Sequence, residues 1–180
     1  MASSSARPRC SVFIAASLDG FIARPDGALD WLARVERAGQ DYGYGAFLDS
    51  VDALVMGRGT YDTVLGFDHW PYPGKRCLVL THAPPVARRA DEEFAGGALE
   101  PLLQRLAGEG VRRVYVDGGA VIRQFLAAGL IDDLTLSVIP VLLGAGIRLF
   151  EGGGAAERGL KLIEAQPYDS GLVQLRYSLD

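Results

Sequence analysis

VYVDGGAVIRQFL, residues 114–126, is the stretch that decides the fold. Its apolar, β-branched run stops at two glycines and apolar residues then return with helical spacing, which predicts a strand, a tight turn and a helix. Gly118 and Gly119 have no Cβ, so they permit a positive φ and let a ligand approach the backbone. The first N–H groups of the helix, near Ala120 and Val121, carry a partial positive charge. The turn therefore suits a phosphate group, although a plain strand-to-helix connection can have the same sequence.

Strands and helices alternate on both sides of this turn. Buried strands are expected at residues 11–17, 52–56, 76–81 and 111–116, and helices at 31–38, 42–50, 60–65, 98–107 and from Gly119 to near Gly129. Three strand-like runs then follow without helices, at 134–142, 160–165 and 172–179. This order predicts a three-layer α/β domain, with a mostly parallel central sheet, antiparallel C-terminal strands and helices on both faces.

Composition and charge indicate one globular domain without a polyanionic partner. The chain has 180 residues, of which 49% are hydrophobic, so we expect a flexible tail at residues 1–9 and a single domain at 10–180. Its net charge of −4 favours neither nucleic acid nor an anionic membrane. No apolar run approaches the roughly 20 residues of a membrane-spanning helix. Cys10 and Cys77 are far apart and lack metal-ligand spacing, which predicts free thiols in a cytoplasmic protein.

Three predicted strand ends carry groups that suit an anion. They are Gly57-Arg58-Gly59-Thr60, Thr81 and Gly118-Gly119-Ala120. The carboxyl ends of parallel strands lie along one edge of a sheet, where open α/β sheets bind their ligands. Arg58 offers a planar donor fork to a phosphate, and Thr60 is expected to cap its helix. Each turn alone could be an ordinary connection, but the three together predict a dinucleotide site.

These segments resemble, in order and spacing, the cofactor motifs of the dihydrofolate reductase superfamily. The matching segments are MGRGTY at 56–61, KRCLVLT at 75–81 and VDGGAVI at 116–122. SLDGFIA at 17–23 and IPVLLG at 139–144 are similar to one branch, the C-terminal reductase domain of the bifunctional riboflavin-biosynthesis deaminase/reductase. The resemblance covers roughly residues 10–180 and implies a dihydrofolate reductase-like fold with NADPH as cofactor.

The resemblance also implies which residues hold NADPH. Ala15 and Ala16 would lie near the nicotinamide, and the Gly118–Val121 turn would hold the pyrophosphate. Arg58 and Thr60 would contact the adenosine phosphate side, and Thr81 the 2′-phosphate region. The full set of expected cofactor-binding residues is Ala16, Gly57, Arg58, Thr60, Thr81, Gly118, Gly119, Ala120 and Val121.

Four further residues are candidates on the substrate side. Asp19 would lie at the mouth of the cavity and orient substrate or relay a proton, although Asp-Gly after a strand is also ordinary turn chemistry. Dihydrofolate reductases carry a tryptophan followed five residues later by the pterin-binding carboxylate, and Trp31 with Glu36 matches this spacing. Glu36 could equally lie on a solvated helix face. Tyr44 could stack on a flat heterocycle or belong to the core.

The expected activity is NADPH-dependent hydride transfer to a small nitrogen heterocycle. The substrate could be 5-amino-6-(5-phosphoribosylamino)uracil, as in the riboflavin branch, or a dihydrofolate-like pterin. A nucleotide-binding module without turnover is the alternative from another class. Phe21 stands where the riboflavin branch usually has arginine, and no basic cluster for a ribose phosphate is evident, so the substrate stays open.

A metal is not expected, and a homodimer is. The zinc-binding set of a nucleotide deaminase is missing from the sequence, and the acidic runs 91–93 and 132–133 are interpreted as solvated charges. The run 134–143 is too apolar for an exposed edge strand. Packing it against a second subunit would cover it, which favours a homodimer, although it could also be buried within one subunit.

Overall fold

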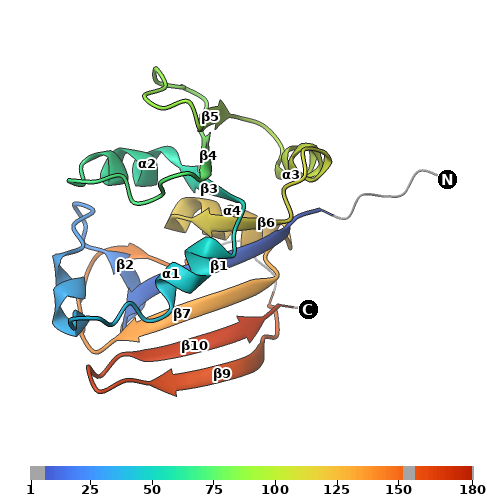
Figure 1. The fold of residues 1–180 in the computed structure, drawn as a ribbon. Coiled ribbons are helices and arrows are strands. Elements are labelled where there is room, and N and C mark those ends of the chain that lie inside the picture. Colours follow the sequence, from blue (N-terminus) through green and yellow to red (C-terminus); the bar gives the residue numbers. More distant parts are fainter. Residues whose placement is uncertain (1–6, 152–156, 180) are drawn as a thin grey trace.

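Parallel strands form the centre of the fold. In the computed structural model, which describes residues 7–151 and 157–179, the main sheet has the order β5-β4-β3-β6-β1-β7-β10-β9 (Figure 1). The strands from β5 to β7 in this order are parallel, whereas β10 is antiparallel to β7 and β9 to β10. The predicted sheet is thus confirmed. The strands are β1 (Arg9–Ser17), β3 (Ala53–Gly57), β4 (Arg76–Leu80), β5 (Glu92–Ala95), β6 (Arg113–Asp117), β7 (Asp133–Ile139), β9 (Lys161–Pro167) and β10 (Val173–Ser178).

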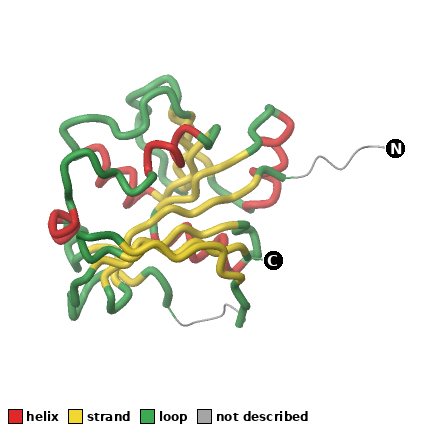
Figure 2. Tube along the Cα trace, turned by 60° about the horizontal axis from the view of Figure 1, so that its bottom comes forward, coloured by secondary structure: helices red, strands yellow, loops and turns green. Residues whose placement is uncertain are grey.

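Helices cover both faces of this sheet (Figure 2). Val55 of β3 belongs to one apolar cluster and its neighbours Leu54 and Met56 to another, because successive side chains of a strand point to opposite faces. The cluster around Val55 is completed by α3 and α4, and the cluster around Leu54 by α1 and α2. The expected three layers are therefore present. The helices are α1 (Tyr44–Asp49), α2 (Arg58–Leu65), α3 (Leu99–Gly108), α4 (Gly119–Ala127) and the 3₁₀ helix η1 (Asp30–Val35).

Two of the predicted helices differ locally from the structure. The helix expected at 31–38 is the shorter η1, because Glu36 already has an extended backbone with ψ of 129°. The helix expected to be capped by Thr60 begins at Arg58, and its N-cap is Gly57, which makes no side-chain cap hydrogen bond. The prediction that Thr60 caps this helix was therefore wrong. Thr60 lies within the first turn.

Both acidic runs make ion pairs, so their interpretation as solvated charges was wrong. The run 91–93 leads into the edge strand β5, where Glu93 pairs with Arg76 at 2.7 Å and also with Arg105. Asp132 and Asp133 lie beside the first residues of β1 and accept hydrogen bonds there. Asp133 is buried and accepts hydrogen bonds from Ser11 Oγ at 2.8 Å and Arg9 Nε at 2.6 Å.

The run 134–143 contains β7, which lies inside the sheet between β1 and β10. The apolar side chains of β7 are buried or half-buried within the chain, whereas Leu142, after the strand, is 70% exposed. The premise that this run would be an exposed edge strand was therefore wrong, and the alternative of burial within one subunit holds for β7. The edges of the sheet are β5 and β9 instead.

The fold begins a little before the predicted boundary. Arg7 forms a two-pronged ion pair with Asp132, at 2.7 and 2.9 Å, and β1 starts at Arg9. Of the predicted tail, residues 1–6 lie outside the described residues. A short two-stranded sheet was not predicted: β2 (Phe21–Ala23) pairs with β8 (Ile147–Arg148).

Candidate active site

A cleft of about 840 Å³ lies at the carboxyl ends of the central strands. Ala15 of β1, Gly57 of β3 and Asp117 of β6 all line it. These strands are parallel neighbours, so their carboxyl ends meet at the same edge of the sheet. This edge is where open α/β sheets bind their ligands.

Two helices begin at this cleft. Gly57 is the N-cap of α2 and Gly118 is the N-cap of α4, and both glycines line the cleft. The first-turn N–H groups of a helix have no partner within that helix and carry a partial positive charge. The residues of these two first turns, which also line the cleft, are Arg58, Gly59, Thr60, Gly119, Ala120 and Val121.

The two turns pack directly against each other. A Cβ added to Gly118 would lie 2.2 Å from Thr60 Oγ1, and one added to Gly57 would lie 3.2 Å from Val121 Cγ2. Gly118 also has a φ of 89°, in the region that favours glycine. The glycines therefore allow the two helix N-termini to share one site.

Arg58 connects this site with the end of β4. Its Nε donates to both carboxylate oxygens of Asp62, at 2.8 and 2.9 Å, and its Nη1 donates to the carbonyl of Ala83 at 3.2 Å. Thr81 does not line the cleft, and its Oγ1 accepts a hydrogen bond from the N–H of Ala83 at 3.1 Å. The segment 81–83 thus lies beside Arg58 at the periphery of the cleft.

Arg123 of α4 is a second cation on the cleft wall, and the sequence analysis did not single it out. Its Nη1 donates to the carbonyl of Arg148 at 2.6 Å, and its Nη2 lies 3.9 Å from Glu151 Oε2. Arg58 and Arg123 therefore place positive charge beside the N-termini of α2 and α4.

Ala15, rather than Ala16, presents its side chain to the cleft. Ala16 is 3% exposed and does not line the cleft, because successive residues of β1 face opposite sides of the sheet. Ala15 also lines a second, smaller cavity of about 330 Å³, here called the side pocket. Phe13, Leu32 and Tyr44 line both cavities as well. The cleft and the side pocket therefore adjoin at these four residues.

Asp19 lies outside both cavities. Its carboxylate accepts hydrogen bonds from Ser17 Oγ at 2.6 Å and from the N–H groups of Leu143 and Gly144 at 3.1 and 2.7 Å. The Ser17 hydroxyl, together with these N–H groups, lowers the pKa of Asp19 to about 2. Asp19 is therefore an ionised group that joins the turn after β1 to the segment after β7, and not a group at the mouth of the cavity.

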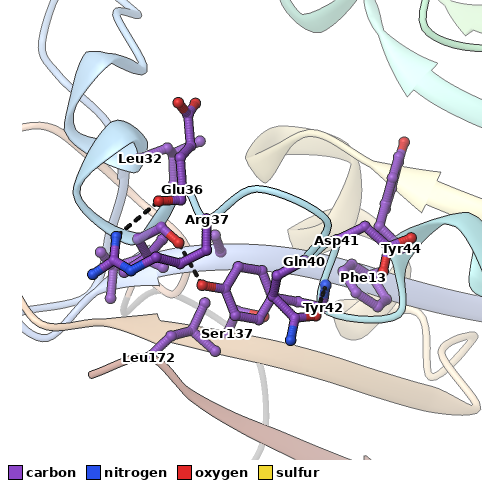
Figure 3. Close-up of a pocket in the computed structure, with 13 residues that line it drawn as sticks. Phe13, Leu32, Glu36, Arg37, Gln40, Asp41, Tyr42, Tyr44, Ser137 and Leu172 are labelled. Atoms are coloured by element: carbon purple, nitrogen blue, oxygen red, sulfur yellow. Dashed lines mark hydrogen bonds between the residues drawn. The ribbon is translucent and has the colours of Figure 1, made fainter. Parts of the chain in front are cut away.

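The remaining substrate-side candidates lie in three different environments. Tyr44 is at the junction of the two cavities. Glu36 is exposed at the rim of the side pocket, and Figure 3 shows its carboxylate directed away from the rings of Tyr42 and Tyr44. Trp31 is 2% exposed and packs with Val35 in an apolar cluster without lining either cavity. The predicted pairing of Trp31 with Glu36 is thus not seen, because one side chain faces the core and the other faces solvent.

Tyr42 connects the wall of the side pocket to the hairpin formed by β9 and β10, here called the C-terminal hairpin. It has a left-handed backbone with φ of 56°, and its hydroxyl donates to the carbonyl of Val35 and lies 2.8 Å from Ser170 Oγ. The Tyr42 ring meets the Tyr168 ring edge-on, with 4.8 Å between centroids. Its carbonyl accepts from Gln174 Nε2 at 2.9 Å. The loop before α1 is therefore held by residues far away in sequence.

Asp117 is a half-buried carboxylate in the cleft that the sequence analysis did not propose as a site residue. Its Oδ1 accepts from the N–H of Gly118 at 2.8 Å and its Oδ2 from the hydroxyl of Tyr72 at 3.1 Å. Burial raises its pKa despite these two bonds. Burial, followed by the charge of Asp117, raises the pKa of Tyr44 to about 12. The sequence signal that could have identified Asp117 is its position between a buried strand and the glycine turn.

Among residues 7–151 and 157–179, no three His, Cys, Asp or Glu side chains are grouped so that they can hold a metal ion. The helices of this same part of the chain include none with the length and apolar character needed to cross a membrane.

Comparisons with known proteins show the family to which the chain is related. The sequence profile described as the RibD C-terminal domain matches residues 8–174. The uncharacterised protein YwjB of Bacillus subtilis is 38% identical over 141 residues, which are 77% of this chain and 80% of YwjB. The riboflavin biosynthesis protein RibD of Corynebacterium ammoniagenes is 30% identical over 158 residues, which are 78% of this chain and 45% of RibD.

Solved structures share the fold over nearly the whole chain. A protein of Shewanella sp. PV-4 that is named for riboflavin biosynthesis superposes with a TM-score of 0.89 at 36% identity, covering 96% of this chain and 99% of that one. The riboflavin biosynthesis reductase Rib7 of Saccharomyces cerevisiae superposes with a TM-score of 0.65 at 15% identity, covering 100% of this chain and 93% of Rib7. At that identity the second match speaks for the fold alone.

Proposed function

Since the chain belongs to the RibD C-terminal domain family, we propose that it is an NADPH-dependent oxidoreductase that transfers hydride to a small nitrogen heterocycle. The resemblance to the dihydrofolate reductase superfamily and its riboflavin branch is confirmed by the family match and the related folds. One observation carries the proposal: the N-termini of α2 and α4 meet at a single cleft, and that cleft adjoins an apolar side pocket at Ala15. The cleft suits a dinucleotide, and the side pocket suits a flat ring.

The cleft has the groups that a dinucleotide phosphate needs. The first-turn N–H groups of α4, from Gly119 to Val121, would hold the pyrophosphate, and the missing Cβ at Gly118 lets Thr60 pack against this turn. Arg58 and Thr60 would bind on the adenosine phosphate side, with Gly57 allowing the close approach. Thr81, beside Arg58 through Ala83, remains our candidate for the 2′-phosphate region.

The chain's own residues would orient the two reactants and exclude water between them. NADPH, when bound, supplies the hydride. Phe13 and Leu32 give the junction of the two cavities apolar walls, and Ala15 keeps it open. Ala16 would act there only through its backbone, since its side chain points to the other face. Holding two reactants in a fixed geometry is a major source of rate enhancement.

We propose that Asp117, rather than Asp19 or Glu36, donates the proton that accompanies hydride transfer to the ring. Asp117 lines the cleft, and burial raises its pKa, so its carboxyl group keeps a proton to higher pH than an exposed aspartate does. The hydroxyl of Tyr72 orients its Oδ2. Asp19 lies outside both cavities, and the carboxylate of Glu36 points from the rim of the side pocket into solvent. Asp117 lines the cleft only, so it would act on the ring from the cleft side of the junction at Tyr44.

The proposed substrate ring lies in the side pocket, against Tyr44 and Phe13. 5-Amino-6-(5-phosphoribosylamino)uracil and dihydrofolate-like pterins are both flat nitrogen heterocycles of suitable chemistry. RibD of Corynebacterium ammoniagenes is named for riboflavin biosynthesis, and this supports the first class. The chain spans less than half of that protein, so the pterin class belongs in the same substrate panel.

We also propose a homodimer in the cytoplasm, formed through the β9 edge. Leu162 is 53% and Ile163 is 48% exposed, although they lie on opposite faces of the strand. An apolar edge strand with free backbone groups is a template for pairing with a second chain. Light scattering of the wild-type protein should give twice the mass of one chain. The double variant L162E/I163E should give the mass of a single chain. A wild-type monomer would contradict this part of the proposal. The buried free thiols of Cys10 and Cys77 support the cytoplasmic location.

Cofactor binding and turnover can be measured separately. At 100 times its Kd, NADPH should raise the free energy of unfolding by about 2.7 kcal/mol, seen as a thermal shift. The absorbance of NADPH should then fall with at least one member of a panel of ribosylaminopyrimidines and reduced or oxidised pterins. Stabilisation by NADPH without oxidation by any acceptor would indicate a nucleotide-binding module instead. No stabilisation at saturating NADPH would overturn the proposal.

A further inference from the structure

We propose that Ser137 recognises the substrate ring, by donating a hydrogen bond to a ring carbonyl oxygen in the side pocket. This inference rests on the proposed function. It assigns a role to a hydroxyl group that lies on β7 and is 4% exposed.

The side pocket has apolar walls and a polar rim whose side chains are exposed to solvent. Phe13, Leu32 and Ile139 are among its apolar lining residues. At the rim, the carboxylate of Asp41 accepts from the N–H groups of Gly43 and Gly45 at 2.9 and 3.0 Å. Cavities of roughly 300 Å³ and more commonly hold small ligands, whose orientation is set by a few polar groups. A polar group that is not already satisfied is therefore the one that can read the ligand.

Arg37, also at the rim, makes bonds that keep its Nη1 away from this task. Nη1 donates to the carbonyls of Arg34 and Glu36, at 3.3 and 2.7 Å. Figure 3 shows these rim residues with Tyr42, Ser137 and Leu172 around the pocket.

Gln174 sets the direction of the hydrogen bond at Ser137. The two residues face each other across β7 and β10, and Gln174 Nε2 lies 3.1 Å from Ser137 Oγ. The same Nε2 lies 2.9 Å from the carbonyl oxygen of Tyr42, which can only accept. The amide must therefore turn its NH₂ group to this side, and it donates to Ser137 as well.

Because Ser137 accepts from Gln174, its own proton is left for another partner. No described residue accepts a hydrogen bond from Ser137, although its side chain lines the side pocket. A buried donor without an acceptor is unfavourable, and a ligand atom that accepts from it gains the corresponding energy. An amino group at the same position could bond to Ser137 only if the hydroxyl turned its proton away from the ligand, and no described residue accepts the proton there.

The position of Ser137 also relates recognition to chemistry. In the sheet it lies directly beside Ala15, whose small side chain faces both cavities. A ring held at Ser137 therefore lies next to the junction with the cleft. The hydroxyl would fix which edge of the ring faces inward and so which ring atom faces the proposed cofactor site.

The test compares two probes that carry an oxygen or an amino group at position 4, the oxo compound also having a proton on the adjacent ring nitrogen. Fluorescence titrations of the NADP⁺-saturated protein would measure binding of 2-amino-4-oxopteridine and of 2,4-diaminopteridine. We expect the oxo compound to bind about 10-fold or more tightly than the diamino compound. Ser137→Ala, and the nearly isosteric Ser137→Cys, should weaken binding of the oxo compound about 10-fold and leave the diamino compound within about 2-fold.

Thr135→Val is the matched control. Thr135 lies on the same face of β7, is also buried, and lines neither cavity, so both affinities should be unchanged. Equal preferences in wild type and Ser137→Ala, or no binding of either probe, would overturn the inference. Thermal stabilisation by NADPH, measured on the same samples, tells the two failures apart. If NADPH stabilises all variants and the probe preference does not change, the cofactor proposal stands and the role of Ser137 does not.

Discussion

The backbone of Gly118 touches the side chain of Thr60, because a Cβ at Gly118 would lie 2.2 Å from Thr60 Oγ1. The contact joins the N-termini of α2 and α4, whose N-caps, Gly57 and Gly118, are 61 positions apart and which follow neighbouring strands of the sheet. The geometry of the cleft therefore depends on the absence of a Cβ atom at Gly118.

Gly118→Ala should lower the free energy of unfolding by more than about 1 kcal/mol and weaken NADPH binding as well. The new Cβ meets Thr60, and the φ of 89° is strained for alanine. Urea unfolding and an NADPH titration would measure the two effects. In the double variant G118A/T60A the contact is relieved but the strained φ is not, so only part of the loss should return. Gly59→Ala is the control, since a Cβ there meets nothing within 4 Å.

Arg58→Ala should raise the Kd for NADPH by about 10-fold or more, since a charge-assisted hydrogen bond to phosphate contributes about 1.5 to 3 kcal/mol. The loss should be smaller at high salt. The variant should unfold with nearly unchanged free energy, because the exposed ion pair with Asp62 contributes about 0.3 to 0.5 kcal/mol. Asp62→Asn releases Arg58 from that pair and should not weaken NADPH binding. An unchanged Kd in Arg58→Ala would mean that Arg58 is only a surface residue.

Asp117→Asn should lower kcat by about 100-fold or more and leave the thermal shift with NADPH unchanged. Burial raises the pKa of Asp117 in the folded protein above its ordinary value of 3.8, so the folded state binds this proton more tightly than the unfolded state does. The contribution of Asp117 to stability therefore falls as the pH rises through that raised pKa. The asparagine variant should gain stability relative to wild type over the same pH range. Full activity in Asp117→Asn would remove Asp117 from the proposed chemistry.

Asp19→Asn should destabilise the fold without changing the pH profile of kcat. The folded-state pKa of Asp19 is about 2, below its ordinary value of 3.8, so its stabilising effect is complete above the ordinary value. That effect is lost as the pH falls towards 2. Thermal melts should thus separate wild type and Asp19→Asn at neutral pH and converge in acid. A shifted kcat profile would instead return Asp19 to the reaction.

Much of the cofactor side could be predicted, because it depends on local signals. A buried run that stops at Gly118 and Gly119 marks a strand end, and parallel strands bring such ends together. What could not be predicted is which alanine of β1 faces the cleft. Ala15 and Ala16 lie in a strand that is buried on both faces, and such a strand has no polar alternation to assign its sides.

The substrate side was harder to predict because its contacts are distant in sequence. Asp19 looked like a mouth residue, but its partners Leu143 and Gly144 are more than 120 positions away. Trp31 and Glu36 had a suggestive spacing, but the 3₁₀ helix ends between them and turns their side chains apart. Ser137 carried no local signal, since its meaning depends on Gln174 across the sheet.

The hydrogen bonds of Tyr42 to Ser170 and Gln174 make the side pocket depend on the C-terminal hairpin. The proposed binding of the ring and the proposed binding of the cofactor therefore depend on different parts of the chain. The cleft proposed for the cofactor is formed by segments before residue 150, whereas the side pocket also depends on the C-terminal hairpin. Changes in that hairpin can therefore alter which ring is accepted while the cofactor machinery stays intact. For the evolution of such a chain, we expect substitutions in this hairpin to change the ring that is bound more readily than the fold.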